Sequence, residues 1–141
     1  MFELLICKIR NLKIGIEVNK IIEIVESKEI TNLPPIFKTL KGMFNLRGDI
    51  LPFLDIGEIL FKEKREGKFN YFVIVESEKG KIGIGIDEVI ENIKTDTIPS
   101  KSAPGKILSE VEKNFLKGVL EKKEEIIYII DVNKLIERED I

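Results

Sequence analysis

The fold of this 141-residue chain is decided by residues 40–60, LKGMFNLRGDILPFLDIGEIL. At its centre, Asn45–Gly48 is typical of a tight turn, because Asn and Gly tolerate the positive φ angles that such turns require. The apolar run Ile50–Leu54 that follows predicts a short strand. The stretch therefore displays a single cation, Arg47, on a turn that is held by a buried strand.

The second half of the stretch carries the signals that end this strand and begin a helix. Pro52 cannot donate a hydrogen bond to a neighbouring strand, so it marks a sheet edge or a strand end. Asp55 has the position of an N-cap, which predicts a short helix over residues 56–61. We therefore interpret Asn45, Gly48, Pro52 and Asp55 mainly as residues that support the turn and the fold.

The chain outside this stretch repeats it. Lys13–Val25 aligns without gaps with Lys81–Ile93 at an offset of 68 residues, and six of the 13 positions are identical. Residues 40–60 align with Leu116–Ile136 at an offset of 76, and five of the 21 positions are identical. The second copy holds eight extra residues between its two blocks, within Lys94–Phe115. An internal repeat of this length is the strongest architectural signal in the sequence.

Each copy predicts about five short strands followed by a capped helix. Strict alternation, as in Ile14, Ile16 and Val18, is the pattern of half-buried strands. We therefore expect an all-β fold of two small β-barrel lobes related by a pseudo-twofold, in one domain over residues 1–141. In the second copy, Asp131 takes the place of Asp55 and predicts a final helix with Val132, Leu135 and Ile136 turned inward.

The repeat also predicts the boundaries of the two lobes. Lobe 1 is expected over about residues 2–60 and lobe 2 over about residues 70–136. A charged linker is expected over about residues 61–69, of which residues 62–68, KEKREGK, are predicted to be exposed. Sequence repeats need not coincide with spatial lobes, because terminal strands can cross from one lobe to the other.

The two copies differ most at the central turn. Asn45–Gly48 in the first copy is replaced by Glu121–Glu124, an ordinary charged turn, in the second. Either turn would serve if only the fold mattered, so the first is the better functional candidate. Two interpretations of Arg47 remain open: it faces a partner protein, or it pairs locally with Asp49 or Glu23 and supports the fold.

Composition excludes several classes of function. The charge is nearly balanced, with 23 basic and 25 acidic residues, so steering by net charge to nucleic acid or membrane is not expected. Histidine is absent, which removes histidine-dependent nucleophilic catalysis and most zinc sites. The single cysteine, Cys7, lies in an apolar run and is expected to be buried and unreactive. No signal peptide or membrane-spanning run is apparent, which predicts a cytoplasmic protein.

The residues fit two other classes of function less well. A carboxylate-dependent enzyme would use acidic clusters such as Asp49, Asp55 and Glu58, but N-capping accounts for Asp55 and its repeat partner. A nucleic-acid-binding barrel would need a basic face with exposed aromatic rings, whereas the eight Phe and two Tyr fall mostly in apolar runs. We therefore expect no catalytic residue, no metal and no cofactor.

The motifs of the chain resemble those of the CheW-like domain family. Residues Gly42–Ile56 are similar to the family signature G-x-x-N-L-R-G-x-x-x-P-x-x-D-L, with Ile56 in place of Leu. Residues 14–24 resemble Y-G-I-D-I-x-x-V-x-E-I, with Ile14 in place of Tyr, and residues 82–89 resemble V-G-I-x-V-D-x-V. Together with Phe115–Gly118, which resembles Y-L-x-G, the motifs span almost the whole chain in the family's order.

This resemblance implies both a fold and a function. It implies two SH3-like five-stranded β-barrels, and a non-enzymatic adaptor that couples chemoreceptors to the histidine kinase CheA in a signalling array. The partners would be the cytoplasmic tips of methyl-accepting chemoreceptors and the regulatory domain of the kinase, without nucleic acid or insertion into the membrane. A related array that controls surface motility or another output is the alternative within the family.

The resemblance also implies binding residues. Family receptors dock in a hydrophobic groove between the lobes, which by position assigns receptor contacts to Ile21, Glu23, Gly42, Arg47, Val89 and Asn92. The ends of the barrels in the family suggest kinase contacts around Gly83 and Ile84. Neither kinase ATP motifs nor a receiver module is expected in this chain.

Overall fold

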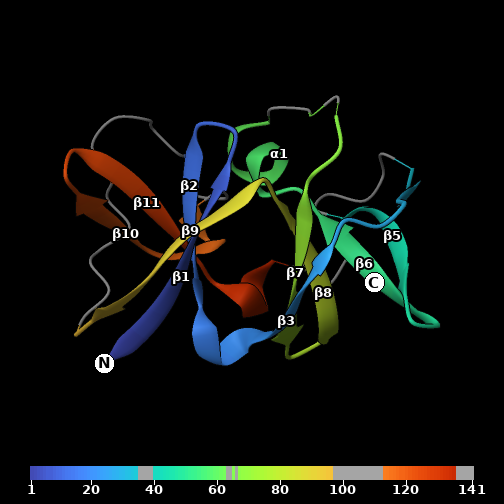
Figure 1. Cartoon of the computed structure of the whole chain (residues 1–141), viewed down its shortest axis with the longest axis horizontal. Helices are drawn as coiled ribbons and strands as arrows, with labels where there is room; N and C mark the ends of the chain where they lie inside the picture. Colours follow the sequence, from blue (N-terminus) through green and yellow to red (C-terminus); the bar gives the residue numbers. More distant parts are fainter. Residues whose placement is uncertain (35–39, 63–64, 66, 97–112, 136–141) are drawn as a thin grey trace.

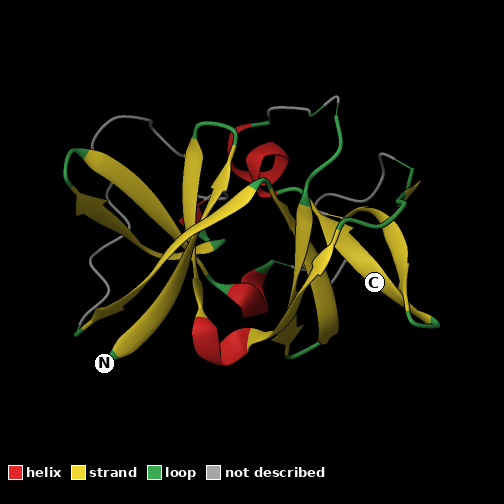
Figure 2. Ribbon diagram, viewed as in Figure 1, coloured by secondary structure: helices red, strands yellow, loops and turns green. Residues whose placement is uncertain are grey.

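The structure is a computed structural model, and it describes residues 1–34, 40–62, 65, 67–96 and 113–135. Strands form almost all of its regular structure, so the prediction of an all-β fold is confirmed (Figures 1 and 2). The described strands are β1 (Phe2–Ile9), β2 (Leu12–Glu17), β3 (Ile21–Glu26), β4 (Thr31–Asn32), β5 (Leu40–Leu46), β6 (Asp49–Leu54), β7 (Tyr71–Ser77), β8 (Gly80–Ile86), β9 (Glu88–Thr95), β10 (Leu116–Lys122) and β11 (Glu125–Ile130). The helices that lie wholly within the described residues are α1 (Ile56–Phe61) and two 3-10 turns, η1 (Val18–Lys20) and η2 (Val132–Lys134).

The strands form two sheets. From here on, the first lobe is the one built on the first sheet and the second lobe is the one built on the second sheet. The first sheet has the order β10-β11-β2-β1-β9, and the second has the order β3-β7-β8-β6-β5-β4. The first lies on the left of Figure 1 and the second on the right, with α1 above the space between them. The second sheet has a sixth strand because the two-residue strand β4 pairs with β5 through Thr31–Met43 and Asn32–Gly42.

The two sheets do not follow the boundaries of the sequence repeat. The hairpin β1–β2 belongs to the first copy but lies in the sheet formed by β9, β10 and β11 of the second copy. The equivalent hairpin β7–β8 of the second copy lies among the strands of the first copy. Each exchanged hairpin is joined to its host sheet by a parallel pair, β2 with β11 and β6 with β8. The repeats have therefore exchanged their first hairpins.

Burial of apolar side chains joins the lobes into one body. The larger core cluster draws from both sheets and includes Cys7 and Ile16 from the first sheet and Phe53 and Phe72 from the second. A smaller cluster of Leu4, Ile6, Ile127 and Ile129 belongs to the first sheet alone. A core shared by two lobes stabilises their mutual position, because separating them would expose apolar surface.

The helix predictions have different outcomes. The helix α1 occupies the predicted residues 56–61, and the Asp55 side chain accepts a hydrogen bond from the Glu58 N–H at 3.3 Å as its N-cap. Within the described residues, the Asp131 cap is followed by a 3-10 turn over Val132–Lys134 in place of the predicted helix. Val132 and Leu135 are buried as expected, whereas Ile136 lies outside the described residues.

The prediction that residues 62–68 are exposed is wrong at Arg65. The Arg65 side chain is only 14% exposed, because its guanidinium pairs with Asp87. Phe69 is buried and packs against the ring of Phe53 at 5.5 Å between centroids. Residues 63, 64 and 66 lie outside the described part of the chain.

Candidate functional site

The tip of the β5–β6 hairpin is a two-residue turn with both central residues at positive φ. Arg47 has φ 49° and Gly48 has φ 95°, between the paired residues Leu46 and Asp49. This is the geometry of a type I′ turn, which matches the twist of the two strands. The Asn45 side chain accepts a hydrogen bond from the Gly48 N–H at 2.9 Å and so stabilises the turn. The Asn45 and Gly48 positions are therefore explained by the turn itself.

The guanidinium of Arg47 forms a two-pronged ion pair with Glu23 on β3. Its nitrogens donate to the two carboxylate oxygens at 3.2 and 2.5 Å. The hydrogen bond from Arg47 lowers the pKa of Glu23, and the same hydrogen bond raises the pKa of Arg47. The local partner is thus Glu23, yet 66% of the Arg47 side chain remains exposed. Arg47 therefore supports the lobe and also presents a cation to solvent.

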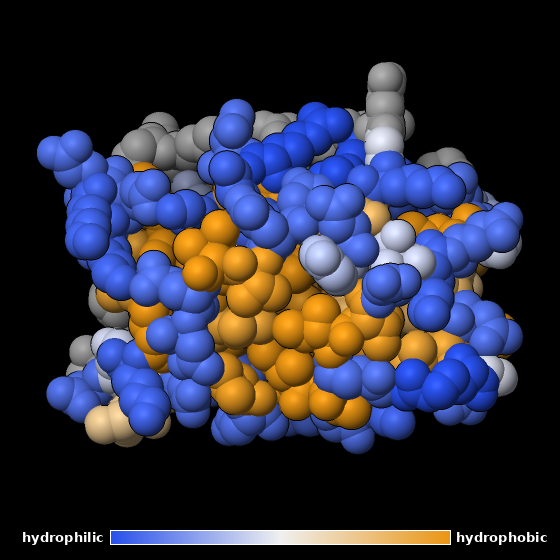
Figure 3. Space-filling view, in the orientation of Figure 1, coloured by the Kyte–Doolittle hydropathy of each residue, from blue (hydrophilic) through white to orange (hydrophobic). Residues whose placement is uncertain are grey.

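Exposed apolar side chains gather on β3 and β9, which we call the apolar face. It consists of Ile22 and Ile24 on β3 and of Val89 and Ile90 on β9, each between 37% and 44% exposed. Figure 3 shows apolar surface across the middle of the molecule, over the region where these strands run in Figure 1. Such a continuous apolar surface is typical of a protein-binding site.

The predicted receptor contacts divide into accessible and covered residues. Val89 and Asn92 are exposed on β9, and Glu23 is one-third exposed beside the apolar face. Ile21 is half-buried and packs against the core, because on β3 it is Ile22 and Ile24 that face outward. Ile22, Ile24 and Ile90 were not among the contacts predicted from the sequence. The available signal on β3 was that apolar residues occupy both alternating sets of positions in residues 21–25, so one set must face outward.

Gly42 is buried, and its role is to allow a close approach of backbones. A Cβ atom at this position would lie 2.5 Å from the Thr31 carbonyl oxygen on β4 and 2.5 Å from Ile30. The pairing of β4 with β5 therefore requires glycine here. Gly42 has no surface of its own through which a partner could touch it.

The two predicted kinase contacts are also buried. Ile84 is fully buried in β8, and Gly83 lies under the ring of Phe44, which a Cβ atom would meet at 2.4 Å. Neither side chain offers surface to a partner, so the prediction does not carry over to these two residues as direct contacts. Their role in this structure is packing in the second lobe.

The remaining predicted residues support the fold. Pro52 pairs with Met43 on β5, and the pairing of β6 with β8 begins only at Phe53, so Pro52 lies where the strand still has one neighbour. Burial raises the pKa of Asp55, against the opposing effect of its hydrogen bond from Glu58. Asp131 accepts a hydrogen bond from the Asn133 N–H at 3.2 Å, as the N-cap of η2.

The acidic side chains of the described residues form no candidate metal site. Among these residues, no three Cys, Asp or Glu side chains come together in a group that could hold a metal ion. The carboxylate of Asp87 is paired with Arg65. Within the described part of the chain, no helix is long and apolar enough to cross a membrane.

Comparisons with known proteins agree over nearly the full chain. The family model for the CheW-like domain matches residues 3–140. A chemotaxis protein CheW from Thermotoga maritima is 24% identical over 96% of this chain and 88% of that protein. One from Treponema pallidum is 24% identical over 90% of this chain and 77% of that protein. The crystal structure of the scaffolding protein TtCheW from Thermoanaerobacter tengcongensis superposes with a TM-score of 0.79, at 25% identity, covering 99% of this chain and 90% of that one.

Proposed function

This chain belongs to the CheW-like domain family, and from that membership we propose that it is a chemotaxis adaptor that couples chemoreceptors to the histidine kinase CheA. Its role is to hold two proteins in a fixed arrangement, without catalysis. We place it in the cytoplasm, recruited to membrane-associated receptor arrays. Its partners in this proposal are the cytoplasmic tips of methyl-accepting chemoreceptors and the regulatory domain of the kinase.

The observation that carries the proposal is the apolar face with the Arg47–Glu23 pair beside it. Glu23 lies between Ile22 and Ile24 in the sequence of β3, and since successive strand side chains point to opposite faces, the Arg47–Glu23 pair lies across this edge strand from the two exposed isoleucines. Apolar contact supplies most of the binding energy in protein interfaces, and a polar rim orients the partner. A helical receptor tip with apolar side chains toward this face, and an acidic or amide group near Arg47, would match it.

The proposed receptor contacts follow from accessibility. We propose direct contact through Ile22, Glu23, Ile24, Arg47, Val89, Ile90 and Asn92. Ile21 and Gly42 would contribute indirectly, by holding β3 and β5 in position. Since Gly83 and Ile84 are buried, the kinase contact is proposed for the surface of the second lobe as a whole and not for these two side chains.

A binding experiment with matched isoleucines tests the proposal. The isolated tip of a cognate receptor and the kinase regulatory domain are titrated separately by calorimetry. Ile24→Glu is expected to weaken receptor binding at least tenfold, because it places a charge in an apolar interface. Ile50→Glu is the control, since Ile50 is 59% exposed on β6 and lies outside the apolar face. Equal losses in the two variants, or no binding of either partner by the native chain, would overturn the proposal.

A further inference from the structure

The polypeptide passes between the two sheets at two places in the described part of the chain. The turn η1 joins β2 of the first sheet to β3 of the second, and Asp87 joins β8 of the second sheet to β9 of the first. Both strands of the apolar face, β3 and β9, therefore begin directly after a crossing (Figure 1). The geometry of the crossings thus determines how the two halves of the face lie relative to each other.

Asp87 is held at its crossing from both lobes. Its N–H donates to the Lys8 carbonyl on β1 at 2.8 Å, and its carboxylate accepts from the Arg10 N–H at 2.6 Å. Its carbonyl accepts from the Asn70 side chain, just before β7, at 2.9 Å. The Arg65 guanidinium donates to both carboxylate oxygens, at 2.9 and 2.5 Å. One residue therefore ties the β1–β2 hairpin to the segment that leads into β7.

The pair between Asp87 and Arg65 is much less exposed than the pair between Lys122 and Glu91, and of the other described pairs only Lys117–Glu17 has a comparably shielded carboxylate. The Asp87 and Arg65 side chains are 20% and 14% exposed, whereas Lys122 and Glu91 are 39% and 45% exposed. Arg65 also donates to the Lys68 carbonyl at 2.8 Å and stacks on the Phe69 ring at 4.2 Å. A two-pronged, shielded pair holds its geometry better than an exposed one.

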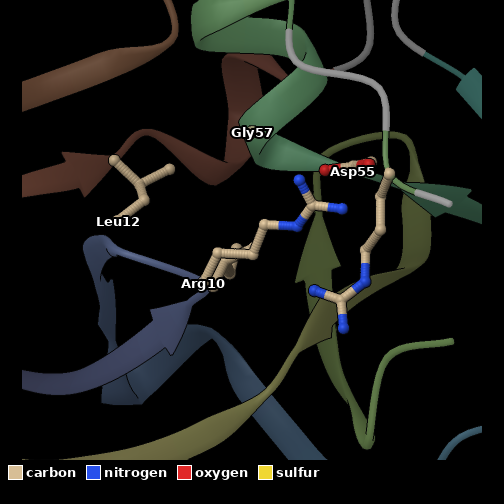
Figure 4. A pocket seen from close by; sticks show the side chains of 6 residues that line it. Arg10, Leu12, Asp55 and Gly57 are labelled. Atoms are coloured by element: carbon tan, nitrogen blue, oxygen red, sulfur yellow. The ribbon is translucent and has the colours of Figure 1, made fainter. Parts of the chain in front are cut away.

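The surroundings of the pair come from both lobes as well. A small cavity beside it is lined by Ile9, Arg10 and Leu12 of the first lobe and by Asp55, Gly57 and Arg65 after β6. Figure 4 shows the Arg10 guanidinium directed toward Asp55 at the start of α1. Burial raises the pKa of Asp87, but the hydrogen bonds from Arg65 and Arg10 outweigh this effect and hold that pKa below its usual value. The carboxylate is therefore ionised at neutral pH.

We propose that the Asp87–Arg65 pair is a clamp that fixes the angle between the two lobes, and with it the spacing of β3 and β9 across the apolar face. Asp87 is a positioning residue in this account: it touches no partner and acts through the two strands. The clamp itself is independent of any ligand. Its consequence for receptor binding rests on the proposed function.

A distance measurement between the two halves of the face tests the clamp without a partner. Spin labels are placed at Glu26→Cys on β3 and Asn92→Cys on β9, both exposed positions. Native Cys7 stays in place, because it is buried and burial raises its pKa to about 12, so it does not react. We expect one narrow distance distribution in the native background, and a shifted or broadened one in Asp87→Asn and in Arg65→Met.

The controls separate a clamp from a pair that only adds stability. Glu125→Gln removes the Lys13–Glu125 ion pair, which lies inside the first lobe, and is expected to leave the distances unchanged. Arg65→Met keeps an apolar side chain of similar length near Phe69 and removes the guanidinium that lies over the ring, so it serves if Asp87→Asn does not fold. Lower thermal stability with an unchanged distance distribution in both clamp variants would overturn the inference.

The binding consequence is measured separately. If about one molecule in ten keeps the native spacing without the clamp, affinity for a receptor tip falls about tenfold. A native chain that binds no receptor tip, while the clamp variants still change the distances, would refute the proposed function and leave the clamp standing. Unchanged distances refute the clamp whatever the binding result.

Discussion

The hairpin tips of the two repeats have the same backbone and different chemistry. At the β5–β6 tip, Arg47 and Gly48 have φ 49° and 95°; at the β10–β11 tip, Lys123 and Glu124 have φ 50° and 66°. The two tips point away from each other at the two sides of the molecule (Figure 1). Both are therefore type I′ turns, although only the first contains the glycine that this turn favours. The repeat preserves the turn geometry and leaves its residues free to differ.

The ion pairs at the tips sharpen this comparison. Glu23 on β3 pairs with Arg47, and its repeat equivalent Glu91 on β9 pairs with Lys122 at 3.1 Å. A cation at the tip that holds the edge strand is thus part of the architecture in both lobes. What distinguishes the first tip is the planar fork of Arg47 and the glycine at the second position of its turn. Functional interest therefore lies in these features rather than in the presence of an ion pair.

The largest expected difference between the repeats is in packing and concerns a pair of equivalent glycines. A Cβ at Gly83 would lie 2.4 Å from the Phe44 ring, whereas a Cβ at Gly15 would find its neighbours at 3.5 Å. We expect Gly83→Ala to destabilise the protein by about 2 kcal/mol, as overpacking does. Gly15→Ala should be neutral or slightly stabilising. Urea unfolding of both variants measures this, and equal effects would contradict the packing difference.

The next expected difference is in binding, at the two cations of the tips. Arg47→Ala should weaken receptor binding about tenfold while the fold stays intact. Lys123→Ala at the equivalent position should change it less than twofold, because in that tip the cation that pairs with Glu91 on β9 is Lys122 and not Lys123. Calorimetric titration gives the affinities, and circular dichroism checks the fold. If Arg47→Ala unfolds the protein, Arg47 is structural and its place in the receptor site is lost.

A smaller difference is expected in turn strain. Glu124 is a non-glycine residue at positive φ, a conformation that costs L-residues about 1–2 kcal/mol. We expect Glu124→Gly to stabilise the protein by about 0.5–1 kcal/mol, since the added freedom of the unfolded chain offsets part of the gain. Gly48→Ala should destabilise it by about 1 kcal/mol, although no atom lies within 4 Å of the added Cβ. If Glu124→Gly and Gly48→Ala change the free energy of unfolding in the same direction, the two turns do not have the same geometry.

Local features were accessible from the sequence because their causes are local. The α1 helix follows from the Asp55 cap and an apolar run, and the first turn follows from Asn45 and Gly48. The turn at Lys123–Glu124 was not recognised as type I′, since neither residue favours positive φ. Its geometry is imposed by the register of β10 with β11.

Long-range features were not accessible, because they depend on which strands meet. The exchange of the first hairpins rests on the parallel pairs of β2 with β11 and β6 with β8, and a repeat pattern fits exchanged and unexchanged pairings equally well. The burial of Gly42 and Gly83 depends on Thr31 and Phe44, which approach them from other strands. Arg65 and Asp87 are 22 residues apart in the sequence. The charge-rich composition of the linker therefore gave no sign that Arg65 is shielded from solvent by this ion pair.

The smallest expected effect is a change in the titration of Glu23, which reports on the Arg47 fork directly. The hydrogen bond from Arg47 is the main cause that lowers the pKa of Glu23. Carboxyl NMR should place its midpoint below the usual value of about 4.3, and Arg47→Ala should raise it toward that value. Lys123→Ala is the matched control and should leave the Glu23 titration unchanged.

The lowered pKa of Glu23 also determines how the ion pair's contribution to folding stability depends on pH. Because the pKa of Glu23 is lowered in the folded state, the pair stabilises the fold above the unfolded pKa, and this contribution is lost as pH falls through the folded pKa. The acid limb of the stability curve should therefore be shallower in Arg47→Ala than in the native chain, with no change between pH 6 and 8. Arg47→Lys separates charge from shape, because it keeps the cation and loses the two-pronged contact. An intermediate Glu23 midpoint in that variant would show that the fork, which the second tip lacks, contributes beyond its charge.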